Sequence, residues 1–221
     1  VRPMLIQMMS LDELCDFICV LNGDVLESQL NTAGRTIDAV TSLRSMAVQL
    51  VEDAQERLAY RAQRYVADEI EAFMPTIEDL DYPGKLDQNK AIEAAEAEAR
   101  PLANESTKAK NVSGDISADS GVWYPPLDRT LMCLAKIYRC IDMKIFEGIA
   151  RDAILACTER LNHGTSELLS QTSAEADKAT QISPRLNANL FLIKHILVLR
   201  EQIAPFEIDY TSTETSLDFT T

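Results

Sequence analysis

The sequence predicts an all-α protein, an elongated bundle or rod segment of several helices joined by long disordered loops. Two features of the composition favour helices: only 7 of the 221 residues are glycine, and aromatic residues make up 6%. Sandwiches and barrels need many turns and strands that are rich in aromatic residues. In addition, apolar residues recur at helical spacing over long stretches of the chain.

Residues 1–74 are predicted to form a hairpin of a short and a long helix. Ser10-Leu-Asp-Glu13 matches a capping box that would begin the first helix, and Asn22-Gly23 is a typical stop signal. The second helix is expected to run from Asp24 to Phe73. One seam position of its heptads holds Leu30, Ile37, Val51, Leu58 and Tyr65, the partner position holds Ala33, Val40, Ala47 and Ala54, and Arg44 and Arg61 interrupt the seam. Four alanines favour close packing in a multi-helix bundle over a two-stranded coiled coil.

Residues 75–121 are predicted to be a connector followed by a disordered insert. The stretch 75–86 contains the turn signal Tyr82-Pro-Gly84, so we expect an ordered connector there. Residues 88–100 have helix-forming composition but little apolar face, which indicates an exposed or marginal helix. Residues 101–121 are polar and without periodicity, which is typical of disorder.

Residues 122–221 are predicted to be part of a helical bundle with a flexible loop at 170–185 and a polar tail. Trp123-Tyr124 is expected to anchor the start of a helix, the alternative being an aromatic platform for a peptide. Pro126 suits the first turn of that helix, which should end near Gly148. A further helix is expected to follow over 149–161.

The helix over 186–203 is apolar on almost all sides, a pattern that predicts burial inside a bundle. On this interpretation, Leu197→Asp would place an unpaired charge in the core and unfold the carboxyl half. His195 lies in the same helix and is expected to be a hydrogen-bonded core or groove residue.

The sequence offers no catalytic, cofactor-binding or metal-binding residues, so we do not expect an enzyme. Glu159 and His163 are four residues apart and would share a helix face, but zinc needs three or four ligands and no third is identifiable. Phosphate loops, nucleophile elbows, HExxH motifs and aspartate-rich magnesium motifs are not found.

Charge and cysteine content point to an intracellular protein that binds neither nucleic acid nor anionic lipid. The net charge of −14 argues against nucleic acid and against direct docking on anionic lipid. No apolar stretch has the length of a transmembrane helix, and no signal peptide is visible. Cys15, Cys19, Cys133, Cys140 and Cys157 all lie in apolar helical patterns and are predicted to be buried, reduced thiols.

Three stretches of the chain resemble one family. These are residues 56–86, residues 122–148, which begin Val-Trp-Tyr-Pro-Pro, and residues 190–210, followed by Ser216-Leu-Asp-Phe219. The most distinctive pieces are the Trp-Tyr-Pro start, the run from Ile137 to Asp142, and Leu-Arg-Glu-Gln-Ile-Ala-Pro-Phe at 199–206. Together they resemble subunit 3 of the conserved oligomeric Golgi complex, outside residues 87–121 and 171–185.

This resemblance implies a non-catalytic subunit of a vesicle-tethering complex, a helical-rod scaffold peripheral to the membrane that acts in intra-Golgi retrograde transport on the cytosolic face of the Golgi. The implied partners are sibling subunits of the complex, with SNAREs, Rab GTPases and golgins beside them, and neither nucleic acid nor direct membrane insertion. We interpret the chain as a middle piece of such a subunit. The alternative is a generic helical adaptor that binds an amphipathic peptide in a groove, which an exposed apolar patch would indicate.

Overall fold

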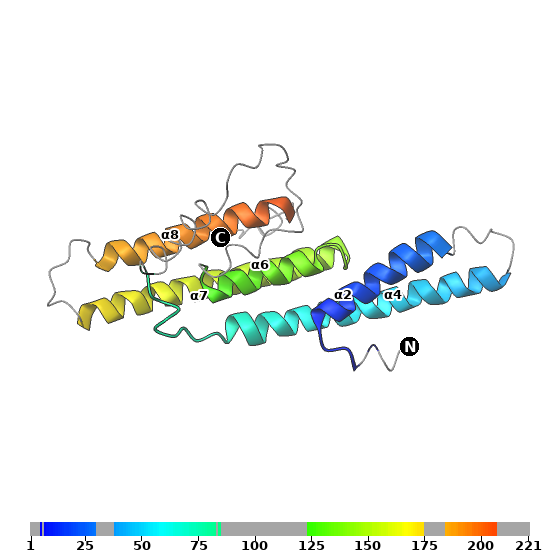
Figure 1. The fold of residues 1–221 in the computed structure, drawn as a ribbon, viewed down its shortest axis with the longest axis horizontal. Helices are drawn as coiled ribbons and strands as arrows, with labels where there is room; N and C mark the ends of the chain where they lie inside the picture. Colours follow the sequence, from blue (N-terminus) through cyan, green and yellow to red (C-terminus); the bar gives the residue numbers. More distant parts are fainter. Residues whose placement is uncertain are drawn as a thin grey trace, which may run out of the picture. The chain divides into compact units, whose positions relative to one another are not determined.

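A computed structural model of the chain describes residues 5, 7–29, 38–82, 84, 123–174 and 184–206. Within these ranges the chain forms helices and turns and holds no strand, so the all-α prediction is confirmed (Figure 1). The elements are the α-helices α2 (Leu11–Val20), α4 (Asp38–Tyr65), α6 (Pro125–Ile137), α7 (Met143–Ala174) and α8 (Pro184–Ile203), the π-helices η1 (Leu21–Gln29) and η2 (Val66–Glu71), and the 3-10 turn η4 (Ala204–Phe206). The marginal helix predicted over 88–100, the insert over 101–121 and the tail from 207 lie outside the described residues.

The first helix begins as predicted but does not stop where predicted. Ser10 is the N-cap residue of α2, although its side chain makes no capping hydrogen bond. The chain then stays helical beyond Asn22-Gly23 as the π-helix η1. A glycine stop uses a left-handed backbone, and Gly23 does not adopt one. Glycine alone costs a helix only about 1 kcal/mol, which is too little to end it.

The predicted seam of the long helix is confirmed over residues 47–58, whereas Tyr65 at its end is half-buried. Ala47, Val51, Ala54 and Leu58 of α4 are all buried. Arg61, predicted to interrupt this seam, donates from Nε to the backbone oxygen of Met9 at 3.0 Å. The seam residues 30, 33 and 37 lie outside the described residues.

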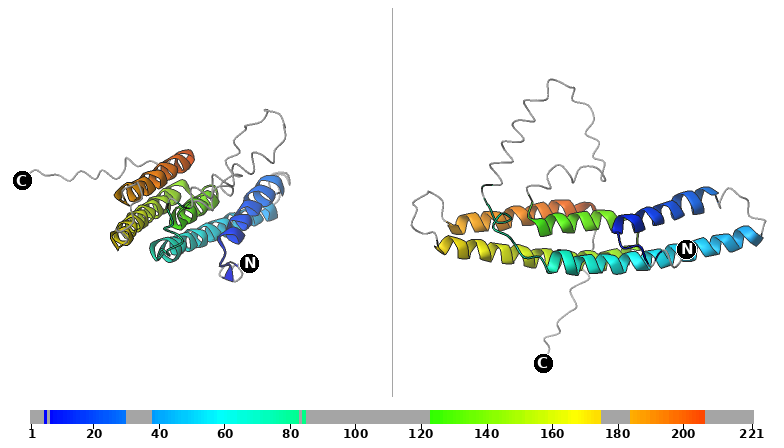
Figure 2. Two further views of the ribbon diagram at one scale, coloured as in Figure 1. Left: turned by 60° about the vertical axis from the view of Figure 1, so that its left-hand side comes forward. Right: turned by 60° about the horizontal axis from the view of Figure 1, so that its bottom comes forward.

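The chain divides into two compact units, which we describe one at a time. Unit 1 comprises Val1–Ala67, Cys133–Ala153 and Phe206–Thr221, and unit 2 comprises Asp68–Met132 and Ile154–Pro205. In unit 1, α2 lies along α4, as all the ribbon views agree (Figures 1 and 2). A salt bridge of 2.8 Å joins Lys136 Nζ to Asp12 Oδ1, and the rings of Tyr138, Phe146 and Phe206 contact one another with centroids 5.0–5.7 Å apart.

The break between α6 and α7 falls at residues 138–142 and not at Gly148, as the sequence had predicted. Asp142 explains the position, because its Oδ1 accepts a hydrogen bond of 2.9 Å from the backbone N–H of Lys144 and so caps the new helix. Helix α7 then runs through Gly148, where the added Cβ of another residue would meet nothing within 4 Å. It extends to Ala174, into the predicted loop of 170–185, and residues 175–183 lie outside the described part of the chain.

In unit 2 the side chain of Tyr124 is the centre of an aromatic cluster. The Tyr124 ring meets those of Phe73, Phe191 and His195 in edge-on contacts, with centroids 5.4–6.2 Å apart. Both Trp123 and Tyr124 are buried, so they anchor the start of α6 and are not available as a platform for a peptide. Burial raises the pKa of the Tyr124 hydroxyl, because the low-dielectric interior disfavours the phenolate.

Four of the five cysteines are buried free thiols, as predicted, whereas Cys19 is exposed. Burial raises the pKa of Cys133 and of Cys157 from the ordinary value of 9.0 to about 12. Both thiols therefore keep their protons well above the pH at which the same groups ionise in the unfolded chain.

We predict that this difference makes the protein less stable above pH 9. The unfolded state releases the two thiol protons there and the folded state does not, so the free energy of unfolding falls as the pH rises from 9 toward 12. Urea unfolding at pH 8 and pH 10.5 measures the loss. Cys157→Ala should reduce the difference between the two pH values, whereas an equal loss in this variant would contradict the assignment to the thiol.

Candidate interaction surface

Helix α8 has two apolar faces, and only one of them is buried. The buried row consists of Ala188, Phe191, His195 and Leu199, and the exposed row consists of Leu186, Leu190, Ile193 and Leu197. At 3.6 residues per turn these rows lie on opposite sides of the helix. The prediction that α8 is buried on all sides was therefore wrong. Leu197→Asp is no longer expected to unfold the carboxyl half, because the Leu197 residue is 51% exposed.

The buried face of α8 is held by hydrogen bonds as well as by packing. The backbone N–H of Tyr124 donates to His195 Nε2 at 3.2 Å, and His195 Nδ1 lies 2.7 Å from the carbonyl oxygen of Phe191. One nitrogen accepts and the other donates, an arrangement that only the neutral imidazole with its proton on Nδ1 can make. The prediction that His195 is a hydrogen-bonded core residue is confirmed.

The exposed face of α8 has the residue spacing of a helix-binding seam. Its four members, which we call the α8 seam, are 44–54% exposed and follow one another at intervals of four, three and four residues. This spacing places apolar side chains on the heptad positions at which one helix receives the side chains of another. The sequence contains this spacing, but apolar residues of the opposite, buried face stand between its members. The two rows together make the helix look apolar on all sides, so the exposed row cannot be told apart in the sequence.

The charge beside the α8 seam is opposite to that of the chain as a whole. Three basic residues, Arg185, Lys194 and Arg200, and one acidic residue, Glu201, lie on α8, whereas the whole chain has a net charge of −14. Arg200 and Glu201 are exposed next to Leu197. A segment that covers the seam is therefore best matched when it is apolar along one stripe and acidic beside it.

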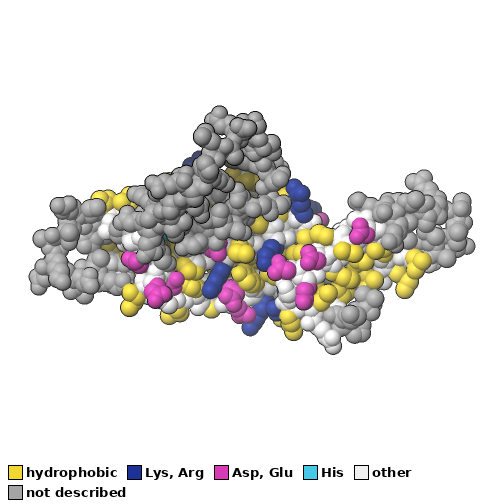
Figure 3. Space-filling view, in the orientation of Figure 1, with side chains coloured by type: hydrophobic (Ala, Val, Ile, Leu, Met, Phe, Trp, Pro, Cys, Tyr) yellow, Lys and Arg dark blue, Asp and Glu magenta, His cyan; other side chains and the backbone are white. Residues whose placement is uncertain are grey.

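Elsewhere on the described surface, exposed apolar side chains form smaller groups, such as Leu43 and Met46 one turn apart on α4. The central part of the face drawn in Figure 3 shows acidic and basic groups interspersed among hydrophobic ones, whereas toward the right-hand end hydrophobic groups gather with few charges. Leu155 of α7 is also 56% exposed, but the exposed positions one helical turn away from it carry Asp152 and Glu159. A single exposed leucine is ordinary, whereas a row of four marks a binding surface.

The described residues do not bring together a set of metal ligands. Glu159 is exposed and His163 is half-buried on α7, and no group of three or more His, Cys, Asp and Glu side chains among the described residues could hold a metal ion. None of the helices in these ranges combines the length and the apolarity needed to cross a bilayer.

Comparison with known proteins places the chain in a family. The family model described as conserved oligomeric Golgi complex subunit 3, C-terminal, matches residues 1–221, including 87–121 and 171–185. Curated relatives of the same name are similar along almost the whole chain. The protein from Drosophila melanogaster is 33% identical over 238 residues, which cover 99% of this chain and 25% of the relative.

The relatives from Mus musculus and Dictyostelium discoideum are 34% and 33% identical over 98% and 99% of this chain, and 28% and 22% of their own lengths are covered. The chain thus spans about a quarter of the length of the curated relatives it matches. No solved structure gives a significant match. The match of the family model over the whole chain and the identity to relatives from three distant organisms show that this chain belongs to the family of conserved oligomeric Golgi complex subunit 3.

Proposed function

We propose that the chain is a non-catalytic part of a Golgi tethering subunit and that it binds sibling subunits of the complex through the α8 seam. The relatives carry the name of a subunit of an oligomeric Golgi complex, and family membership supports the same assembly here. In this proposal the protein acts at the cytosolic face of the Golgi in intra-Golgi retrograde transport. SNAREs, Rab GTPases and golgins are further partners of the assembled complex.

The single observation that supports binding by this part of the subunit is the row of half-exposed apolar residues on α8. Leu186, Leu190, Ile193 and Leu197 leave one side of the helix without the cover that the opposite side has. When a second helix removes a continuous row of apolar side chains from water, the burial stabilises the complex by about 25 cal/mol for each Å² buried.

The partner proposed for this surface is an amphipathic helix of a sibling subunit. The intervals of four, three and four residues favour a helix over an extended peptide, because an extended strand repeats every two residues. The excess of Arg and Lys on α8 favours Asp or Glu beside the apolar stripe of the partner. When several such contacts act in one complex, multivalency makes the overall affinity much higher than that of any one contact. The affinity of each single contact can therefore be modest.

We predict that Leu190→Glu combined with Leu197→Glu, in the full-length subunit, weakens its capture of sibling subunits at least tenfold. The glutamates remove apolar area and repel an acidic partner, while their exposed positions leave the folded state intact. Affinity purification with quantitative mass spectrometry measures the loss, and thermal unfolding verifies the fold.

The matched control is Leu155→Glu, which makes the same substitution at an exposed leucine of α7 with polar surroundings. This variant should retain the sibling subunits. A photo-crosslinking residue at position 193 should label a sibling helix rich in Asp or Glu. Labelling only of the same chain or of a second copy, or equal capture by both leucine variants, would contradict the proposal.

A further inference from the structure

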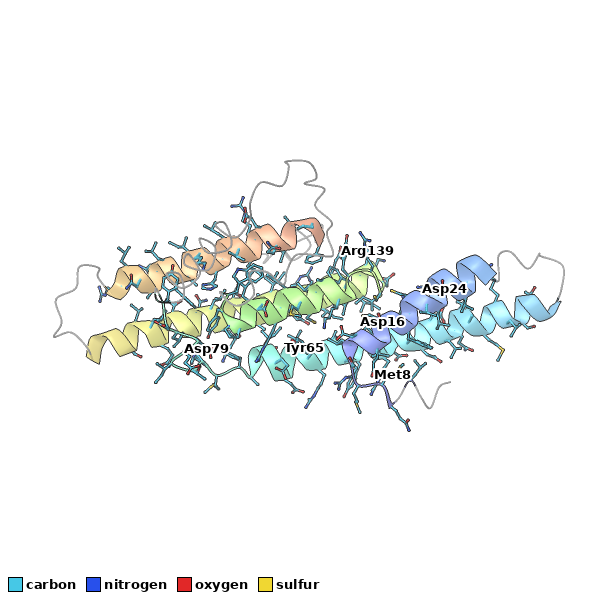
Figure 4. All side chains as sticks on the ribbon, in the orientation of Figure 1. Met8, Asp16, Asp24, Tyr65, Asp79 and Arg139 are labelled. Carbon is cyan, nitrogen blue, oxygen red and sulfur yellow. The ribbon has the colours of Figure 1, made fainter. Side chains whose placement is uncertain are left out.

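Three of the five cysteines meet in unit 1 although the sequence separates them widely. Cys15 and Cys19 lie four residues apart on α2, and Cys140 lies in the turn between α6 and α7. Figure 4 locates the two segments by the neighbouring residues Asp16 and Arg139. Cys15 Sγ and Cys140 Sγ both lie close to the backbone oxygen of Lys136, and Cys19 interacts with Cys140, so the three thiols lie in one cluster.

Of these three thiols, Cys15 and Cys140 are the two that share a hydrogen-bond acceptor. Both thiols are directed at one acceptor, the backbone oxygen of Lys136, at 3.4 Å from Cys15 Sγ and 3.5 Å from Cys140 Sγ. Two bonds hold the segments in this position. Gln55 Nε2 donates to the backbone oxygen of Cys140 at 3.0 Å, and the salt bridge of Lys136 with Asp12 ties α6 to α2.

We propose that Cys15 and Cys140 are a peroxide-sensitive thiol pair that forms a disulfide between α2 and the turn after α6. Both Sγ atoms lie within 3.5 Å of the same oxygen atom, so the two side chains already converge on one point, as a disulfide with an S–S bond of about 2.05 Å requires. In a reducing compartment the thiols stay free, and the disulfide forms under an oxidative load.

The chemistry is balanced with hydrogen peroxide as the oxidant. The Cys15 thiolate attacks one oxygen of the peroxide, the O–O bond breaks, and the released hydroxide takes a proton to leave as water. Cys15 is then a sulfenic acid. The Cys140 sulfur attacks Cys15 Sγ, its proton leaves with the sulfenic oxygen as a second water, and the S–S bond forms. Two thiols are oxidised and one peroxide is reduced to two waters.

The two residues differ in their access to solvent. Cys15 retains the larger exposed fraction, 8% against 4% for Cys140. We therefore assign the attack on the peroxide to Cys15 and the closing of the disulfide to Cys140.

The test uses this chain and the full-length subunit, each treated with hydrogen peroxide and digested without reduction. Mass spectrometry should find a peptide pair joining Cys15 to Cys140, lighter than the two free peptides by two hydrogen atoms. Oxidation should raise the melting temperature of the chain, because the link constrains the unfolded state, and dithiothreitol should reverse the shift.

Cys15→Ser and Cys140→Ser should each abolish the linked peptide and the melting shift. Cys19→Ser is the matched control. It removes the exposed thiol of the cluster and should leave both the linked peptide and the melting shift unchanged. Since a serine variant could also lose the shift by failing to fold, circular dichroism of each reduced variant must match that of the parent. A link from Cys19 to Cys140, or sulfinic acid at Cys15 with no link, would overturn the proposal.

Discussion

Replacing Gly164 by leucine is expected to lower the free energy of unfolding by about 3 kcal/mol. Gly164 is buried on α7, and a Cβ at this position would lie 3.0 Å from Tyr124 Oη and 3.2 Å from Tyr124 Cζ. Tyr124 cannot give way easily, because its ring is fully buried among Phe73, Phe191 and His195. Urea unfolding followed by circular dichroism at 222 nm measures the change.

Gly148 provides the control for this prediction within the same helix. It is exposed, and a Cβ there would meet nothing within 4 Å. Gly148→Leu should therefore keep the stability or raise it by up to about 1 kcal/mol, since leucine is the better helix former. If both variants unfolded at the same urea concentration, the close contact between Tyr124 and α7 could not be a feature of the folded protein.

Phe191→Ala is expected to cost about 4 kcal/mol of stability, the loss that is typical when a buried phenylalanine is truncated. The Phe191 ring is 2% exposed and contacts Tyr82, Tyr124 and His195, with centroid distances of 5.6, 5.4 and 4.3 Å. Its removal leaves a cavity at the centre of the aromatic cluster of unit 2. The urea midpoint should fall with little change in the slope of the transition.

The opposite face of α8 supplies the comparison. Leu197→Asp should change the free energy of unfolding by less than about 1 kcal/mol, mainly through the lower helix propensity of aspartate, because its side chain projects into water. Equal losses in the two variants would mean that both faces of α8 are buried in the folded chain, and the α8 seam would then not be available to a partner.

The sequence predicted the structure best where a single local pattern applies and no other pattern opposes it. The row Ala47, Val51, Ala54 and Leu58 is buried as the heptad pattern predicted, because amphipathic spacing leaves one side of a helix to pack. The start of α6 at Pro125 and the buried anchor Trp123-Tyr124 were readable for the same reason. The family was also recognisable from residues 56–86, 122–148 and 190–210, since the order and spacing of their motifs are specific.

Helix ends were less predictable, because capping depends on a few weak hydrogen bonds. Gly148 carried a stop signal and α7 passes through it, whereas Asp142 begins that helix by accepting a hydrogen bond from the backbone N–H of Lys144. An aspartate directly before a run of apolar residues at helical spacing would have been the signal for the start of this helix. The difference between a stop and a continuation is about 1 kcal/mol at a single glycine, which tertiary packing can exceed.

By itself the sequence determined that this protein is helical, that it belongs to a family of Golgi complex subunits, and that His195 lies in the core, because periodicity, residue order and apolar surroundings are local properties. Only the tertiary structure decided which side of α8 is covered and which thiols meet. A helix that is apolar all round can be buried completely or present a second face, and this depends on the helices around it. Likewise, Cys15 and Cys140 come together only because α2 packs where the turn after α6 returns to it.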